Sequence, residues 1–298
     1  MKFLKTTDDT TDIVREEVQR LRARGVDIVL RHRTDRTGFK AGALEEGLAE
    51  AKGDFVAIFD ADFIPEPDFL QRMMPWFTED VGMVQARWGH LNARSTWLTA
   101  CQATLLDGHF VVEHSARFRS GRWFNFNGTA GIWRKSTIEE AGGWQHDTLT
   151  EDLDLSYRAQ MKGWRFIYRQ DVVSPAELPE DISALRAQQY RWAKGTVQTA
   201  RKLLRRVLSS DLTLAQRAEA CFHLTPHFAY PLMVLLTVLL LPVMLTVDAS
   251  NVETMLLYDV PLCMAPMSSL AAFYMLAETA QGRSKWGALK LLPALIAL

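Results

Sequence analysis

The sequence predicts an α/β domain in which helices wind around a parallel sheet, followed by α-helices that lie along a membrane and then cross it. Residues 10–62 alternate helical and strand patterns, as wound sheets do. Residues 182–220 form an amphipathic stretch, and residues 221–298 contain long runs without charge. We therefore expect an α/β domain at 1–181, an interfacial region at 182–220 and membrane-spanning helices at 221–298.

The alternation of elements starts near the N-terminus. Over Thr10–Arg24, apolar residues recur at helical spacing among charges, and Val26–Leu30 has the pattern of a short buried strand. Phe39–Ala51 combines small and apolar residues as a helix does, and Phe55–Phe59 is a strongly β-prone run. A helix, a strand, a helix and a strand are expected in that order.

The elements that follow are expected to alternate less regularly. A helix is predicted over Phe69–Phe77, a strand over Gly82–Ala86 and a long helix over Trp97–Phe118. Ile182–Leu208 interleaves apolar residues with Arg and Lys, so its helix can lie along a membrane surface.

The C-terminal third carries the membrane prediction. Cys221–Val247 contains no Asp, Glu, Lys or Arg and is long enough to span a bilayer, and Val260–Ala277 is a second uncharged run. A third apolar stretch follows Lys290 and stops with the chain, so we expect a helix that is cut short. A buried helical hairpin of a soluble protein is the alternative, but runs this apolar usually face lipid.

Flanking charges predict the orientation of these spans. Acidic residues join the two complete runs, whereas basic residues precede the first and follow the second: Arg201, Lys202, Arg205, Arg206, Arg217, Arg283, Lys285 and Lys290. Positive residues mark the cytoplasmic side. The expectation is a multi-pass protein of the cell membrane, inner or plasma, whose α/β domain is cytoplasmic.

The overall composition excludes several classes of protein. With 34 basic and 35 acidic residues the net charge is −1, and no basic face suited to nucleic acid is visible. Cys101, Cys221 and Cys263 are far apart and form no CxxC pair, so neither a disulfide framework nor a zinc site is expected.

Three clusters carry candidate chemistry, and the first is Asp60-Ala61-Asp62. It follows the β-prone run directly, and ligands of wound sheets bind beyond the carboxyl ends of the strands. One carboxylate can hold a divalent cation, Mg²⁺ or Mn²⁺, while the other contacts a ribose or base edge. The alternative is an acidic turn that caps a helix.

The second cluster is Thr150-Glu151-Asp152, which comes before a helix expected to start near Leu153. A carboxylate in this place can act as a general base, with Asp152 as the candidate. Acidic residues at a helix N-terminus also complement the helix dipole, and that structural reading is the commoner one for such a motif taken alone.

The third cluster, Gln188-Gln189-Tyr190-Arg191-Trp192, puts a guanidinium beside an indole on the amphipathic stretch. Arg suits a diphosphate, and Trp offers a flat face to a sugar. Basic and aromatic residues near a membrane are more often interfacial anchors. The order of all three clusters therefore carries more weight than any one of them.

In that order the clusters resemble the Asp-x-Asp, Thr-Glu-Asp and Gln-x-x-Arg-Trp motifs of the processive family 2 glycosyltransferases, which include cellulose, chitin, hyaluronan and mannan synthases. The resemblance runs from about Thr7 to the C-terminus. Phe39–Leu44 and Phe126–Gly131 are similar to the mannan and glucomannan synthase branch. The fold that this implies is a glycosyltransferase-A-like mixed sheet with flanking helices, followed by interfacial and transmembrane helices.

The resemblance also implies roles for individual residues. Asp60 would contact the nucleotide, Asp62 would ligate the metal, and Asp152, with Glu151 beside it in the motif, would be the catalytic base. Lys40 would approach the diphosphate, and three residues would help to hold diphosphate and acceptor: Gln188, Arg191 and Trp192. Gly128–Gly131 would let the backbone come close to sugar or growing chain, with simple close packing as the alternative.

One departure concerns the start of the chain. Members of the family begin with an apolar strand and then a second strand that ends in paired aspartates. Here Leu4 and Lys5 fall where those aspartates are expected. We therefore expect a first strand to be missing, and the channel helices after Leu298 likewise, so that the chain is truncated at both ends.

The predicted reaction is an inverting transfer of a hexosyl unit from a UDP- or GDP-sugar to a growing β-linked polysaccharide, either a cellulose-like glucan or a mannan or glucomannan. The implied partners are the nucleotide-sugar donor, the polysaccharide acceptor, the lipid bilayer and synthase partner subunits, with no nucleic acid. Two alternatives stay open: transfer of a single sugar to a lipid carrier, and an inactive truncated membrane scaffold.

Overall fold

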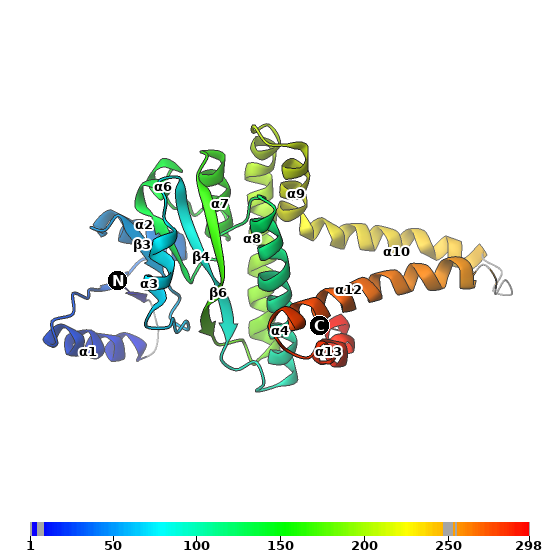
Figure 1. The fold of residues 1–298 in the computed structure, drawn as a ribbon, viewed down its shortest axis with the longest axis horizontal. Coiled ribbons are helices and arrows are strands. Elements are labelled where there is room, and N and C mark those ends of the chain that lie inside the picture. The colour runs from blue at the N-terminus through cyan, green and yellow to red at the C-terminus, as the bar shows by residue number, and fades with distance from the viewer. Residues whose placement is uncertain (1, 5–8, 247–252, 254, 298) are drawn as a thin grey trace.

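The computed structural model describes residues 2–4, 9–246, 253 and 255–297. Its centre is a mixed sheet with helices on both faces, and the long helix α8 (Ile182–Leu208) stands beside this domain. Two apolar helices, α10 (Ala229–Thr246) and α12 (Val260–Ala280), extend away from the domain roughly across the direction of α8 (Figure 1).

Four strands form the main sheet in the order β3 (Phe55–Ile58), β5 (Gly131–Arg134), β4 (Val81–His90) and β6 (Arg165–Ala176). β4 and β6 are parallel, whereas β5 runs antiparallel to both of its neighbours. The mixed sheet that the family resemblance implied is therefore present, whereas, among the described strand pairs of this sheet, the parallel arrangement expected from the alternation of elements is found only in β4–β6. Periodicity identifies strands but not their direction. The chain leaves β4, passes through α4 (Trp97–Asp107), η2 (Gly108–His114) and α5 (Ser115–Arg119), and returns as β5 in the opposite direction.

The N-terminal residues form a second, two-stranded sheet. β1 (Lys2–Leu4) pairs in parallel with β2 (Leu30–His32), with α1 (Thr10–Ala23) between them. This short strand ends at Leu4, where the resemblance aligned the paired aspartates, and Lys5 lies outside the described residues. The strand predicted at Val26–Leu30 lies later in the chain, since Gly25 (φ 85°) ends the helix in a turn and leaves Val26 46% exposed.

Helices bury both faces of the main sheet. One face packs against α2 (Phe39–Glu50), α6 (Lys135–Glu140) and α7 (Glu151–Met161), and the other against α3 (Phe69–Met73). A short 3₁₀ helix, η1 (Met74–Trp76), continues α3 because Pro75 cannot donate the next hydrogen bond. The expected helices at 39–51 and 69–77 are therefore present, the second in two parts.

The long helix expected from Trp97 to Phe118 is present, with an irregular middle. It consists of α4 (Trp97–Asp107), the π-helical segment η2 (Gly108–His114) and α5 (Ser115–Arg119). A π-turn shifts the side chains that follow it around the helix axis, and such turns are frequent at functional sites.

The amphipathic helix α8 packs against the domain along its apolar side. Leu153 and Tyr157 of α7 share a buried cluster with α8 and with α9 (Leu214–Leu224). The first uncharged run does not form one straight helix, because the chain bends by 63° between Leu214–Leu224 and Pro226–Pro242. Its first four residues belong to α9, where Leu224 is fully buried, and after a 3₁₀ turn, η3 (Pro226–Phe228), α10 begins.

Over the described residues, one helix is long and apolar enough to cross a membrane, Leu256–Ala280, which comprises the end of the π-helical turn η4 (Met255–Asp259) and α12. The bent pair around Thr225 makes a second candidate if it is counted as one span. The last helix, α13 (Lys285–Ala297), packs against α4 and α12 through a small apolar cluster that includes Tyr274 and Leu295.

Candidate active site

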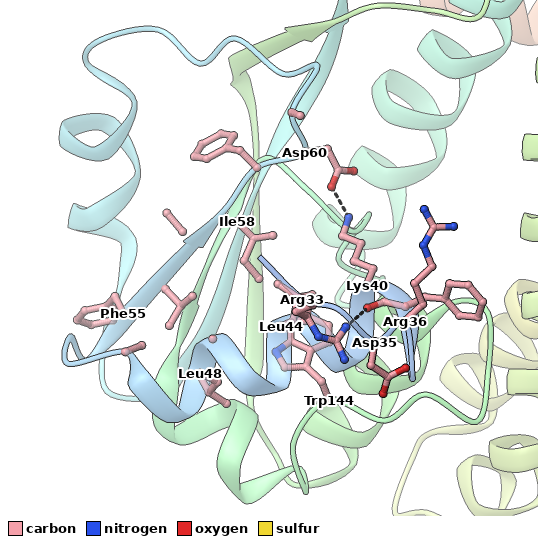
Figure 2. Close-up of a pocket in the computed structure, with 18 residues that line it drawn as sticks. Arg33, Asp35, Arg36, Lys40, Leu44, Leu48, Phe55, Ile58, Asp60 and Trp144 are labelled. Carbon is pink, nitrogen blue, oxygen red and sulfur yellow. Dashed lines mark hydrogen bonds and ion pairs between the residues drawn. The ribbon is translucent and has the colours of Figure 1, made fainter. Parts of the chain in front are cut away.

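Lys40 occupies the centre of the candidate site. It lies in the first turn of α2, and its Nζ donates to Asp60 Oδ1 at 2.5 Å and to the carbonyl oxygen of Gly128 at 2.9 Å. The backbone N–H of Asp60 donates to Thr129 Oγ1 at 2.8 Å. The end of β3 and the loop before β5 are thus joined, and Figure 2 shows Lys40 reaching up from α2 to Asp60.

Residues 127–130 form a tight loop whose shape depends on Gln85. This fully buried side chain of β4 donates to the carbonyls of Thr129 and Ala130 at 3.0 and 3.1 Å and accepts from the N–H of Asn127 at 3.1 Å. Gly128 has φ 80°, where a Cβ would lie 3.2 Å from Asp152 Oδ2. Gln85 was not among the predicted site residues, although a polar residue inside a buried strand is an unusual signal.

Asp152 lies beside this loop, at the N-terminus of α7. Ser156 Oγ donates to its carbonyl oxygen at 2.6 Å and accepts from the N–H of Phe126 at 2.8 Å, which fixes the helix end against the loop. Burial, and next the negative charge of Glu151, raise the pKa of Asp152 to about 7. Such a carboxylate can take up a proton near neutral pH.

Glu151 shares the same surroundings. Burial raises the pKa of its carboxyl, and the positive charges of Lys40 and Arg191 oppose that rise. Arg191 is exposed on α8, and its positive charge acts to lower the pKa of Glu151. The third cluster therefore interacts electrostatically with the second.

The contact between α8 and α7 holds the second cluster in place. A Cβ at Gly195 would lie 2.5 Å from Thr150 Cγ2, so only glycine lets α8 come this close. Thr150 Oγ1 and Thr199 Oγ1 are 3.1 Å apart, and the N–H of Leu149 donates to Gln198 Oε1 at 3.0 Å. The helix that carries the third cluster therefore positions the second.

A buried ion pair lies behind Asp152. Asp154 and Arg158 are 2.7 Å apart with side chains 0% and 4% exposed, and Lys202 of α8 approaches Asp154 at 2.9 Å. Arg158 also donates to the carbonyl oxygen of Gly143 at 2.9 Å. The sequence interpretation missed this pair, although Asp and Arg four residues apart on a helix are the pattern for it.

Asp62 is exposed and lines neither of the two cavities that adjoin this cluster. Burial, followed by the charge of Asp60, raises the pKa of its carboxyl. Across the part of the chain that the structure describes, no three His, Cys, Asp or Glu side chains gather as a ready cation cage. A metal here would take few protein ligands.

Two cavities meet the cluster from different sides. The first, of about 830 Å³, lies between α2 and β3. Its mouth carries charged groups and its interior is apolar (Figure 2). The charged residues are Arg33, Asp35, Arg36, Lys40 and Asp60. The apolar residues include Leu44, Leu48, Phe55, Ile58 and Trp144. The edge of β3 away from β5 has no strand partner among the described residues.

The second cavity, of about 720 Å³, has Asp152 in its wall. It runs between the π-turn of η2 and helix α8 toward the start of α10, and it receives Gln188 and Trp192 of the third cluster together with Tyr230. The structure thus brings Lys40, Asp60, Glu151 and Asp152 together and places Gln188 and Trp192 in an adjoining space.

Comparison with known proteins identifies relatives of this chain. Residues 5–195 match a family model described as "Glycosyltransferase like family 2". Glucomannan 4-beta-mannosyltransferase 1 of Oryza sativa subsp. japonica is 44% identical over 215 residues, which are 69% of this chain and 41% of that protein. Glucomannan 4-beta-mannosyltransferase 2 of Arabidopsis thaliana is 42% identical over 215 residues, which are 69% of this chain and 40% of that protein. The chain spans about two fifths of the length of these relatives.

Solved structures share the fold. A mannosyltransferase from Pyrobaculum calidifontis, in complex with GDP-Man and Mn²⁺, superposes with a TM-score of 0.60 at 22% identity, over 91% of this chain and 74% of that one. Residues 1–349 of TarS from S. aureus, in complex with UDP-GlcNAc, give a TM-score of 0.50 at 14% identity, over 97% and 77%. The mixed sheet with flanking helices is therefore glycosyltransferase-A-like, as expected.

Proposed function

This chain belongs to the family 2 glycosyltransferases, and from that membership we propose that it moves a hexosyl unit, with inversion, from a UDP- or GDP-sugar to a growing β-linked mannan, glucomannan or cellulose-like glucan. The observation that carries the proposal is the cluster in which Lys40, Asp60 and Asp152 meet at the loop of Gly128, with a cavity on either side. The named activities of the plant relatives favour mannosyl transfer.

The donor nucleotide would bind at the mouth of the first cavity. Arg33, Arg36 and Lys40 bring positive charge to this mouth, which suits a diphosphate, and Asp60 would contact the nucleotide. Lys40 is already hydrogen-bonded to Asp60 and to the backbone of the Gly128 loop, so its ammonium group is held in position before any donor arrives.

A divalent cation fits Asp62. The carboxylate is exposed at the end of a strand, its pKa is raised, and a bound cation would favour the charged form that desolvation and Asp60 oppose. Carboxylate oxygens suit Mg²⁺ or Mn²⁺, and both ions take remaining ligands from phosphates and water. When bound, the ion would supply neutralisation of the departing diphosphate.

Asp152 would act as the general base. An acceptor hydroxyl that enters from the second cavity would pass its proton to the Asp152 carboxylate as its oxygen bonds the anomeric carbon. The nucleoside diphosphate would leave from the opposite face, toward Lys40 and Arg191. Attack and departure on opposite faces invert the configuration, and a β-linked product results from an α-linked donor.

The acceptor would occupy the second cavity and leave along the apolar helices. Trp192 supplies a flat face, and Gln188 supplies amide groups for sugar hydroxyls. Because α10 and α12 extend roughly across α8 (Figure 1), α8 would lie along the surface of a cell membrane that those helices enter. In this arrangement the α/β domain, α8 and α9 are cytoplasmic, α10 and α12 lie in the bilayer, and synthase partner subunits would complete the channel.

The test is sugar incorporation by membranes that carry this chain. Radiolabelled GDP-mannose and UDP-glucose are supplied separately, with Mn²⁺, with Mg²⁺ or with EDTA, and long polymer is separated from lipid-extractable product. Polymer that requires a divalent ion is the expected product. Label found only in a glycolipid would show transfer to a lipid carrier instead, and no incorporation from either donor would favour the inactive scaffold.

The pH dependence of transfer gives an independent check on Asp152. Because its pKa is raised to about 7, the basic form that accepts a proton is lost as the pH falls through 7. We expect the rate at saturating donor to be about tenfold lower at pH 6 than at pH 8. A rate that stays flat across this range would contradict the assignment, whereas initial rates from pH 5.5 to 8.5 that fall on the acidic side would support it.

A further inference from the structure

The π-turn of η2 places two polar side chains on the wall of the second cavity. His109 Nδ1 and Glu113 Oε2 lie 2.9 Å apart, and both residues line the cavity. Their side chains are 31% and 44% exposed, so the pair opens onto the cavity rather than into the protein core. A hydrogen-bonded polar pair that faces a cavity is available to a ligand.

The pair is linked to the catalytic loop. His109 Nε2 is 3.4 Å from Asn127 Oδ1, and Asn127 immediately precedes Gly128, whose carbonyl accepts from Lys40. Asn125 Nδ2 also donates to Asn127 Oδ1, at 3.2 Å. A ligand that engages His109 would therefore lie next to the loop that borders Asp152.

Neighbouring charges keep Glu113 ionised. Burial alone would raise the pKa of its carboxyl, but the hydrogen bond with His109 and the charges of His109 and Arg117 hold the pKa below its usual value. Arg117 lies 3.7 Å from Glu113 and makes its shorter contact, 2.7 Å, with Glu219. Glu113 thus keeps acceptor capacity that its protein partners do not fill, which is what a sugar hydroxyl requires.

We propose that Glu113, held in place by His109, binds a hydroxyl of the terminal sugar of the acceptor and orients it, against the indole of Trp192, for attack over Asp152. This inference rests on the proposed function, since it assigns the acceptor end of the same site. The ligand is a neutral, hydroxyl-rich β-linked oligosaccharide. His109 and Glu113 are positioning residues, because the proton passes to Asp152.

The test measures oligosaccharide binding, which needs no turnover. Mannotetraose and cellotetraose are titrated into the purified full chain in detergent while tryptophan fluorescence is followed, because Trp88 and Trp192 line the cavity. We expect Glu113→Gln and His109→Phe each to raise the Kd of the better ligand by about 10–100-fold, the effect of losing a hydrogen bond to a charged group. Glu139→Gln, an exposed carboxylate on α6 outside the cavity, is the matched control and should leave the Kd unchanged.

A second readout separates positioning from a structural role. The KM for the acceptor should rise in both variants by a larger factor than kcat falls, while Glu139→Gln keeps the wild-type KM and the wild-type release of sugar from the donor to water. An unchanged Kd in Glu113→Gln, which keeps the size of the side chain, would overturn the inference, as would a wild-type chain that binds neither oligosaccharide. Binding that depends on the pair, without sugar transfer from any donor, would support the inference and refute the proposed function.

Discussion

Replacing Asp152 by asparagine is expected to lower the rate of sugar transfer by about 10²–10⁴-fold, the usual contribution of a general base. The amide keeps the size of the carboxylate and cannot accept a proton from the acceptor. Burial and the adjacent charge of Glu151 raise the pKa of Asp152 to about 7, so the wild-type group is matched to proton transfer near neutral pH. Initial rates of incorporation at saturating donor measure the effect.

The control for this change is Asp80→Asn, which removes an exposed carboxylate paired with Arg165 at the start of β4 and β6, outside both cavities. Its transfer rate should equal that of the wild type. Donor affinity should be preserved in Asp152→Asn, because Lys40 and Asp60 are unchanged. A variant that keeps more than a tenth of the wild-type rate would refute the role of Asp152 as base.

The local sequence patterns predicted where Asp60 and Asp152 lie in the fold but not how they are connected. Asp60 follows its strand, and Asp152 starts its helix, as the local patterns indicated. Their connection could not be read from the sequence, because it runs through Gln85 and Thr129 at separations of dozens of residues. Local periodicity contains no information on such pairings.

One strand of the main sheet was missed. The segment Gly131–Arg134 was assigned to no strand, yet it occupies the middle of the sheet and runs antiparallel to β3 and β4. It is four residues long and opens with a glycine, so the β-favouring Ile132 and Trp133 are too short a run to identify a strand. The surrounding strands, with Trp133 buried between them and α7, determine its conformation more than its own composition does.

The membrane region shows a similar limit. Absence of charge marked Cys221–Val247 as one span, but hydropathy does not report where a helix is packed against protein. Ala220 and Leu224 are buried against α8, and the chain bends before Pro226, where a proline lacks the N–H that would continue the helix. The sequence pattern likewise did not indicate the π-turn that carries His109 and Glu113, because it predicted one regular helix over Trp97–Phe118.

Replacing Asp154 by alanine should destabilise the fold by about 3–5 kcal/mol, the range measured when one partner of a buried ion pair is removed. Arg158 would remain 4% exposed with carbonyl oxygens as its only close acceptors, and Lys202 would lose its link between α8 and α7. For a chain of this size the loss corresponds to a thermal midpoint about 5–8 °C lower.

Circular dichroism of the purified protein in detergent would measure this shift, with Asp80→Ala as the control. Asp80 and Arg165 also form a close pair, at 2.6 Å, but their side chains are 57% and 51% exposed, so water replaces the lost partner and the midpoint should not move. Equal midpoints for the two variants would show that burial does not distinguish the pairs. Because Asp154 lies two residues after Asp152, the Asp154 variant should also lose transfer at temperatures where it stays folded, through displacement of the helix end that carries the base.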